Sequence, residues 1–205
     1  MVPVPGQTNP WTTLIYDLRD SSAGIREKAA TVIFQCGCEL ARPAIGRWLA
    51  DDPLSNCFVI DASQFPEATV GLAVEPSNFE LIRQACGSPR LADVPTDQDA
   101  REFELEFPGG IRLDILTTCE PGGSGVMARH LQRFGESIQQ VELLAKNVDE
   151  ATRILRSRFD LTPVFPATRA GANGTRVNFF LVPAPHGKKI LIELVEAGPA
   201  VRTVC

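Results

Sequence analysis

The sequence has no long hydrophobic run. Its longest apolar stretches, such as residues 190–192, are far shorter than the roughly 20 residues that a membrane-spanning helix needs. The first ten residues have neither a basic start nor an apolar segment typical of a secretion signal. We therefore expect a cytoplasmic protein without a membrane partner.

The patterns of disulfide-rich and nucleic-acid-binding proteins are missing as well. Six cysteines in 205 residues, with no export signal, indicate free thiols rather than a disulfide framework. The 20 Lys and Arg residues are outnumbered by 25 Asp and Glu residues, and they form no basic stripe interleaved with aromatic residues. We expect no nucleic-acid partner, whereas the 44% hydrophobic content is enough for a substantial globular core.

The N-terminal part of the chain carries helical periodicity. Ile25, Ala29 and Ile33 recur on one helical face, which predicts a helix of about three turns. Pro43 is expected to end or open an element, because a proline ring is tolerated only in the first turn of a helix. Ile45 and Trp48 form a short apolar stripe after it, so the pattern predicts a helical hairpin.

From residue 64 the pattern changes to short apolar runs of strand length. Residues 69–74, 103–107 and 111–117 are predicted strands, and a helix capped by Ser77 and Glu80 lies between the first two. The glycine-rich residues 119–125 follow as a linker. The same order then returns, with strands at 138–145, 177–182 and 190–195 and a helix capped by Asn147 and Glu150.

These two stretches have the spacing of an internal repeat. Ser77 and Asn147 are 70 positions apart (147 − 77), and so are Glu80 and Glu150 (150 − 80). The closing strands are offset by 79 positions (190 − 111), because the second stretch has longer hairpins. Identity between the stretches is low, so chance recurrence of ordinary α+β patterns is the alternative.

Two segments carry a family resemblance. Residues 134–141 read F-G-E-S-I-Q-Q-V, and residues 186–196 read H-G-K-K-I-L-I-E-L-V-E. The first resembles the G-E-G and I-H-H-V pattern that opens the second half of methylmalonyl-CoA epimerase-like proteins. The second is similar to their closing H-G-V-L-I-E-L-V-E. These proteins belong to the vicinal oxygen chelate superfamily, which includes glyoxalase and bleomycin-resistance proteins.

The resemblance implies a fold and a division of the chain. We expect an α+β protein in which two βαβββ modules form a cup-shaped, eight-stranded mixed sheet. Residues 1–63 would be an N-terminal helical segment, and residues 64–118 the first module. Residues 119–136 would form a linker and helix, and residues 137–205 the second module and a tail. Whether the modules pair within one chain or between the chains of a homodimer stays open.

The strand pattern predicts which side chains line the cup. Alternating side chains point to opposite faces of a strand. Because Val70, Leu72 and Val74 form the apolar set, they should pack beneath helices. The residues that alternate with them, Thr69, Gly71 and Ala73, should then face the cleft. The same phase places Gln140 and Glu142 in the cleft, with Arg112 and Asp114 sharing one face and Leu191 and Glu193 another.

The family's metal positions, carried over one by one, fall on Thr69, Asp114, Gln140 and Glu193. Neither family histidine is present, and divalent transition metals prefer imidazole nitrogen. The resemblance therefore implies either no cofactor or a weakly bound divalent ion such as Mg²⁺, Mn²⁺ or Ca²⁺, held by Asp114, Glu193 and Gln140.

The carboxylates of Asp114, Glu142 and Glu193 would share one partly dry cup and repel one another. This repulsion should raise the pKa of at least one of them, as a general base near neutral pH requires. Our leading hypothesis is a glyoxalase-like isomerase, epimerase or lyase that removes a proton next to a carbonyl in a small acid or acyl-CoA. Glu193 or Glu142 would be the base, and Arg112, Gln140 and Thr69 would bind substrate. The alternative for Arg112 is a purely structural ion pair with Asp114 or Glu193.

Two other functions stay open. Without the histidines, the cup could serve a metal-free protein that binds or sequesters a small molecule, as bleomycin-resistance-type relatives do. The N-terminal helices could also dock a partner protein through Trp11 and Trp48, although aromatic residues packing onto the modules are the commoner case.

Overall fold

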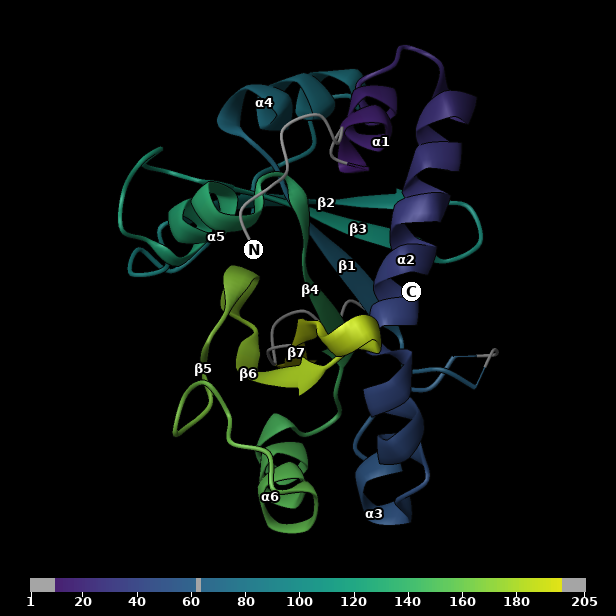
Figure 1. The fold of residues 1–205 in the computed structure, drawn as a ribbon, viewed down its shortest axis with the longest axis vertical. Helices are drawn as coiled ribbons and strands as arrows, with labels where there is room; N and C mark the ends of the chain where they lie inside the picture. The colour runs from purple at the N-terminus through teal and green to yellow at the C-terminus, as the bar shows by residue number, and fades with distance from the viewer. Residues whose placement is uncertain (1–9, 62–63, 197–205) are drawn as a thin grey trace.

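The protein is an α+β structure in which three N-terminal helices precede one mixed sheet (Figure 1). The computed structural model describes residues 10–61 and 64–196. The N-terminal helices are α1 (Trp11–Leu18), α2 (Ala23–Leu49) and α3 (Asp52–Ser55). The remaining elements are β1 (Ala68–Ala73), α4 (Pro76–Ala85), β2 (Ala100–Phe107), β3 (Ile111–Thr118), α5 (Val126–Phe134), β4 (Ser137–Leu144), α6 (Val148–Phe159), β5 (Arg169–Ala170), η1 (Ala172–Gly174), β6 (Arg176–Pro183), η2 (Pro185–Gly187) and β7 (Lys189–Glu196).

The sheet is curled and is formed within a single chain. Its strand order is β2-β3-β1-β4-β7-β6-β5. In the first half β1 pairs with β3 in parallel, and in the second half β4 pairs with β7 in parallel. The two halves join at the centre, where β1 and β4 are antiparallel. Both halves therefore contribute to one continuous surface.

The described sheet has seven strands rather than the expected eight. The first half holds β1, β2 and β3, whereas the second holds β4, β5, β6 and β7. Residues 87–99, between α4 and β2, form no strand. Their backbone does not suit one, because Pro89 and Pro95 have no N–H to donate and Gly87, Ser88 and Asp99 have positive φ angles.

The predicted helical hairpin at Pro43 is wrong, because α2 is one helix of 27 residues with Pro43 inside it. Pro43 is exposed, while Ala44, Ile45 and Trp48 on the following turn are buried. The Trp48 ring stacks on Phe58, with ring centroids 6.3 Å apart and planes 9° from parallel. We attribute the continuous helix to this packing, which outweighs the local penalty of the proline.

Helix α2 covers the face of the sheet that is turned away from the cleft. It contacts strands of both halves, namely β1, β3, β4, β6 and β7, and it runs along most of the molecule's length (Figure 1). Gly37 allows the close approach: a Cβ there would lie 2.6 Å from Val70 Cγ2. The predicted burial of Val70 and Leu72 is confirmed, but the helix over Val70 is α2 of the N-terminal segment rather than the helix that follows β1. Within the described ranges, no helix combines the length and apolar character that crossing a membrane requires.

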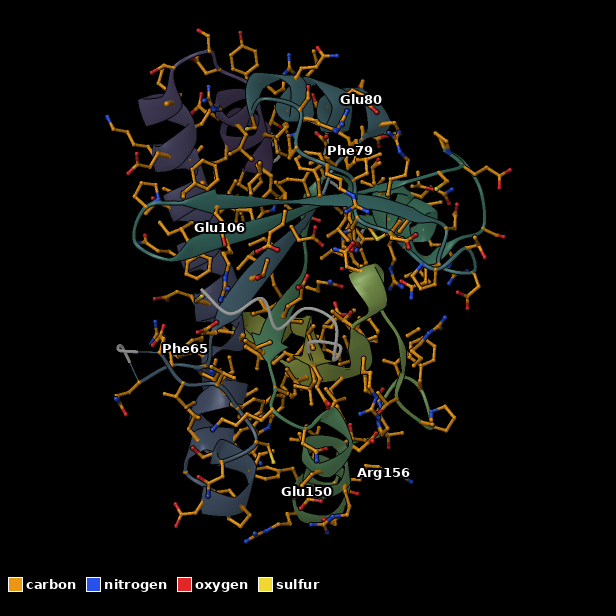
Figure 2. The ribbon with its side chains drawn as sticks, turned by 180° about the vertical axis from the view of Figure 1, so that it is seen from behind. Phe65, Phe79, Glu80, Glu106, Glu150 and Arg156 are labelled. Atoms are coloured by element: carbon orange, nitrogen blue, oxygen red, sulfur yellow. The ribbon has the colours of Figure 1, made fainter. Side chains whose placement is uncertain are left out.

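The predicted cap of α4 is wrong. The helix begins at Pro76, its N-cap residue is Glu75, and Ser77 lies inside the first turn. Glu80 instead pairs with Arg101 on β2, at 2.7 Å. Phe79 points from α4 toward the sheet (Figure 2), where it meets Phe103 edge-on with ring centroids 4.8 Å apart.

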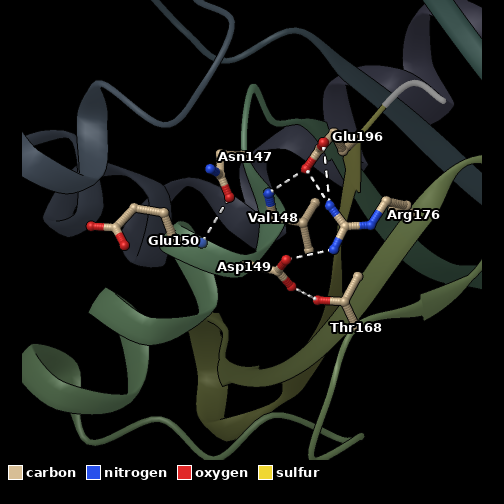
Figure 3. A network of polar contacts seen from close by, with 7 residues as sticks. All are labelled: Asn147, Val148, Asp149, Glu150, Thr168, Arg176 and Glu196. Carbon is tan, nitrogen blue, oxygen red and sulfur yellow. Dashed lines mark hydrogen bonds and ion pairs between the residues drawn. The ribbon is translucent and has the colours of Figure 1, made fainter. Parts of the chain in front are cut away.

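The predicted cap of α6 is confirmed in part. Asn147 Oδ1 accepts the backbone N–H of Glu150 at 2.9 Å, but the Glu150 side chain pairs with Arg153 rather than turning back. Glu196, at the end of β7, accepts the backbone N–H of Val148 at 2.8 Å (Figure 3). These bonds fix the start of α6 against the last strand of the sheet.

The same corner is tied to β6 by charge. Arg176 pairs with Asp149 of α6 and with Glu196 of β7, and Asp149 also accepts a hydrogen bond from Thr168 (Figure 3). The second half of the sheet is thus held by both main-chain and side-chain contacts.

Five cysteines in the described part of the chain are free thiols, and Cys205 lies outside the described residues.

Candidate functional site

A cleft of about 1110 Å³ lies against the strands of both halves, on the face opposite α2. Its polar lining comes both from strand residues and from the loops beside the sheet, and α5 also borders it. The strand residues with polar or charged side chains are Thr69, Glu102, Glu104, Asp114, Gln139, Gln140, Glu142, Arg169 and Glu193. The cleft therefore contains Asp114, Gln140, Glu142 and Glu193, which the sequence placed there.

Strand register brings these side chains together. Glu142 on β4 is aligned with Glu193 on β7 and with Thr69 on β1. Asp114 on β3 is aligned with Gly71 on β1, which in turn is aligned with Gln140 on β4. The apolar neighbours of these residues along each strand point to the other face and are buried there. They are Leu113, Val141, Leu143, Ile192 and Leu194. Alternation thus separates an acidic floor from an apolar core.

A β-bulge adds a residue that the sequence reading missed. The pairing of β1 and β4 shifts between Gly71 and Leu72, so Gln139 is left without a partner on β1. Ile138 and Val141 both belong to the core, while Gln139 and Gln140 both line the cleft. Two core residues three positions apart are incompatible with strict alternation, and this break in the pattern could have indicated the bulge.

Gln140 joins the two carboxyl groups of the second half. Its Nε2 atom donates to Glu193 Oε2 at 2.6 Å and to Glu142 Oε1 at 3.0 Å. Gln140 and Glu193 are buried, with 6% and 8% of their surfaces exposed. The amide nitrogen of Gln140 therefore lies between the carboxyl groups of Glu142 and Glu193 and donates a hydrogen bond to each.

Burial is the main cause of unusual acidity in this cluster. It raises the pKa of Glu142 to about 8, with a further contribution from Glu102. Burial also raises the pKa of Asp114 and that of Glu193 well above their ordinary values, and neighbouring carboxylates add to both shifts. Several carboxyl groups in the cleft therefore keep a proton near neutral pH, because ionising them together is unfavourable.

Glu102 is a second residue that the sequence reading missed. It lies on β2, lines the cleft, and has a pKa raised to about 7 by burial and by Glu104. In residues 101–107 the apolar side chains of Phe103 and Leu105 alternate with glutamates. Applying strand alternation to this segment would have placed Glu102 and Glu104 opposite the core.

Arg112 does not line the cleft. Its guanidinium pairs with Glu67 at 3.1 Å and borders a separate hollow of about 860 Å³ between α2 and the turn joining β2 to β3. Arg112 lies near the start of β3, and its guanidinium bonds to Glu67, which lies directly before β1. Arg112 therefore makes a structural ion pair, as the alternative interpretation expected, but its partner is Glu67 rather than Asp114 or Glu193. Thr69, by contrast, is half-buried and borders the cleft.

Residues 87–99 contact residues 169–173 of the second half along one side of the cleft. The backbone N–H of Asp93 donates to Asn173 Oδ1 at 3.0 Å, and the backbone N–H of Asn173 donates to the Asp93 carbonyl at 2.9 Å. Gln98 Nε2 donates to the Ala170 carbonyl at 3.0 Å, and Asp97 pairs with Arg169. Residues 87–99 therefore contact the second half of the chain where the expected eighth strand would have been. Arginine side chains also border the rim, at positions 90, 129 and 169.

The residues of the cleft do not fit a divalent transition metal. Neither histidine lines it, because His130 on α5 bonds to Ser137 and His186 lies in the exposed turn η2. The nitrogen of the Gln140 amide, rather than its oxygen, faces Glu142 and Glu193. Across residues 10–61 and 64–196, no three His, Cys, Asp or Glu side chains are arranged to hold a metal ion. The donor set contains no imidazole and presents an N–H where a ligand atom would be needed.

The curled mixed sheet and its strand-lined cleft have the architecture of the vicinal oxygen chelate superfamily. Similar solved structures include several methylmalonyl-CoA epimerases, which belong to that superfamily, and this confirms the predicted resemblance. The enzyme from Mycobacterium tuberculosis is 29% identical over 66% of this chain and 90% of its own, with a TM-score of 0.52.

Two further structures support the fold. A Streptomyces coelicolor methylmalonyl-CoA epimerase variant in complex with 2-nitronate-propionyl-CoA is 20% identical, covers 69% of this chain and 99% of its own, and has a TM-score of 0.52. A methylmalonyl-CoA epimerase in complex with methylmalonyl-CoA and NH₄⁺ is 21% identical, with 70% and 96% coverage and a TM-score of 0.51. No protein-family model and no curated protein matches the sequence.

Proposed function

We propose that the protein is an epimerase-like enzyme that moves a proton next to the carbonyl of an acyl-CoA thioester or a small acid. The observation that carries the proposal is the sharing of one cleft by carboxyl groups from both halves, with pKa values raised toward or above neutrality. General bases work best when their pKa is close to the operating pH. The arrangement of each half around parallel first and last strands supports a duplicated βαβββ unit.

In this mechanism Glu102 and Glu142 exchange protons with the two faces of the reacting carbon. With a pKa of about 7, Glu102 is partly ionised at neutral pH, and its carboxylate takes the proton from the carbon. The electrons of the broken C–H bond move onto the carbonyl oxygen and give an enolate. Glu142, which is protonated at neutral pH because its pKa is about 8, then gives a proton to the opposite face. Glu193 holds the Gln140 amide that positions Glu142.

A protonated Asp114 would stabilise the enolate. Burial keeps the pKa of this carboxyl well above its ordinary value, so it carries a proton that it can donate. A neutral carboxylic acid in an apolar site is an effective hydrogen-bond donor to a developing oxyanion. The arginine side chains at positions 90 and 129 on the rim would pair with the phosphates of an acyl-CoA.

The experiment is proton–deuterium exchange at the α-carbon of methylmalonyl-CoA in D₂O, followed by mass spectrometry. We expect exchange by the wild-type protein and a loss of 100-fold or more in Glu102→Gln, which is the range for removing a general base. Glu106→Gln is the matched control, since Glu106 lies on the same strand but borders the other hollow, and it should exchange at the wild-type rate. Wild-type protein that gives no exchange with methylmalonyl-CoA, propionyl-CoA or free methylmalonate would refute the proposal.

A metal-free binding protein is the second candidate. It is favoured by the absence of histidine from the cleft and by the apolar side chains that border it, such as Val126, Val164, Phe165 and Phe179. The same experiment separates the two functions. Saturable binding of methylmalonyl-CoA, measured by calorimetry, with no deuterium incorporated would favour the binding protein.

A further inference from the structure

The amide of Gln140 lies between two carboxyl groups and uses both of its N–H bonds there. Its nitrogen is 2.6 Å from Glu193 Oε2 and 3.0 Å from Glu142 Oε1. A primary amide has two N–H donors, and both point to acceptors in this arrangement. A divalent cation that bridged Glu142 and Glu193 would have to occupy the space that this nitrogen fills.

The neighbouring strand is shaped to accept this side chain. Gly71 on β1 is directly aligned with Gln140, and a Cβ at Gly71 would lie 2.6 Å from Gln140 Cγ and 2.9 Å from Leu116 Cδ1. Any larger residue at this position would displace the glutamine or Leu116. The register shift next to Gly71 also lets Gln139 and Gln140 both face the cleft. The place of the amide is thus built by the glycine as well as by its hydrogen bonds.

We propose that Gln140 is a positioning residue whose side-chain amide replaces a bridging cation between Glu142 and Glu193, so that the cleft works without a divalent metal. The proposal rests on the proposed function only in treating this cleft as the working site. This proposal predicts the direction in which metal affinity changes when Gln140 is replaced. If the amide occupies the cation's place, removing it should strengthen metal binding, whereas removing a metal ligand should weaken it.

The test compares Mn²⁺ binding by the wild-type protein and Gln140→Leu, using isothermal titration calorimetry at pH 7.5. The leucine side chain ends one bond short of the glutamine amide nitrogen, so it leaves the space between the two carboxyl groups free and offers neither a donor nor a ligand atom. We expect the wild-type protein to bind Mn²⁺ with a dissociation constant in the millimolar range or weaker, and Gln140→Leu to bind at least tenfold more tightly. Gln139→Leu is the matched control, because Gln139 shares the bulge but has no hydrogen bond to the two carboxyl groups, and its affinity should equal that of wild type.

Gly71→Ala provides a second variant that keeps every carboxyl group and the amide itself. The added methyl group should push Gln140 aside, and Mn²⁺ affinity should rise in the same direction as in Gln140→Leu. Circular dichroism establishes that each variant is folded, and if Gln140→Leu is not, the wild-type protein and Gly71→Ala decide.

Three results would overturn the proposal. They are micromolar Mn²⁺ binding by the wild-type protein, weaker binding after Gln140→Leu, and no gain in either variant. None of them depends on deuterium exchange, so this proposal and the proposed function can fail separately.

Discussion

Replacing Glu142 by glutamine should make the protein more stable at pH 8 than the wild type. In the unfolded chain this glutamate ionises near its ordinary pKa of 4.5, whereas burial in the folded protein raises its pKa to about 8. Between these values the unfolded state loses a proton that the folded state keeps. The stabilisation that this glutamate contributes is therefore fully present below pH 4.5 and is lost as the pH rises to about 8.

The magnitude follows from the two pKa values. A difference from 4.5 to about 8 corresponds to about 5 kcal/mol for an isolated group. The neighbouring carboxyl groups take up part of the titration, so we expect Glu142→Gln to gain at least about 2 kcal/mol over the wild type at pH 8. At pH 4.5 the two proteins should differ little, because glutamine keeps the oxygen that accepts from Gln140.

Urea unfolding followed by circular dichroism at pH 4.5, 6 and 8, at constant ionic strength, measures this effect. Glu80→Gln is the control, since its carboxylate pairs with Arg101 in a contact where both side chains are about two-fifths exposed. Its stability should follow the wild-type pH profile. Parallel profiles for wild type and Glu142→Gln between pH 4.5 and 8 would contradict the assigned burial of the Glu142 carboxyl.

Two further variants test the fold around the site. Pro43→Ala should raise the free energy of unfolding by about 1–2 kcal/mol, because it restores a main-chain hydrogen bond in α2, and the melting temperature should rise by about 2–8 °C. An unchanged or lower value would show that Pro43 is accommodated without cost. Asn173→Gly should lose about 1 kcal/mol and speed amide exchange at Asp93, because it removes one hydrogen bond between the loops while keeping a residue that tolerates a φ of 52°. Unaltered exchange at Asp93 would mean that the side chain does not hold the loops together.

Strand alternation was the most informative part of the sequence. It placed Val70 and Leu72 in the core and Gln140, Glu142 and Glu193 in the cleft, because a strand buried on one face has only one acceptable phase. The same rule applied to β2 would have found Glu102. The position of Arg112 was harder to predict, since its long side chain lies near the start of β3 and reaches Glu67 outside the aligned strands.

Features that depend on tertiary packing were not predictable in this way. A proline inside a helix contradicts local propensity, and only the burial of Ile45 and Trp48 against the rest of the protein explains why α2 continues. The absence of the expected eighth strand from the described sheet also depends on tertiary contacts. Residues 87–99 bond to residues 170–173 on the other half of the chain, and no local pattern indicates that pairing.

The long helix and the acidic cleft are two sides of one energetic arrangement. Placing Asp114, Glu142 and Glu193 in a shared buried space destabilises the fold, since their protonation or mutual repulsion offsets part of the folding free energy. The same strands carry apolar residues on the opposite face, and α2 covers them across both halves of the sheet. Burial of large side chains such as Trp48 contributes about 2–3 kcal/mol each. We infer that the N-terminal helix supplies stability that lets these strands hold ionisable groups in an unfavourable setting, which is the setting that proton transfer at carbon requires.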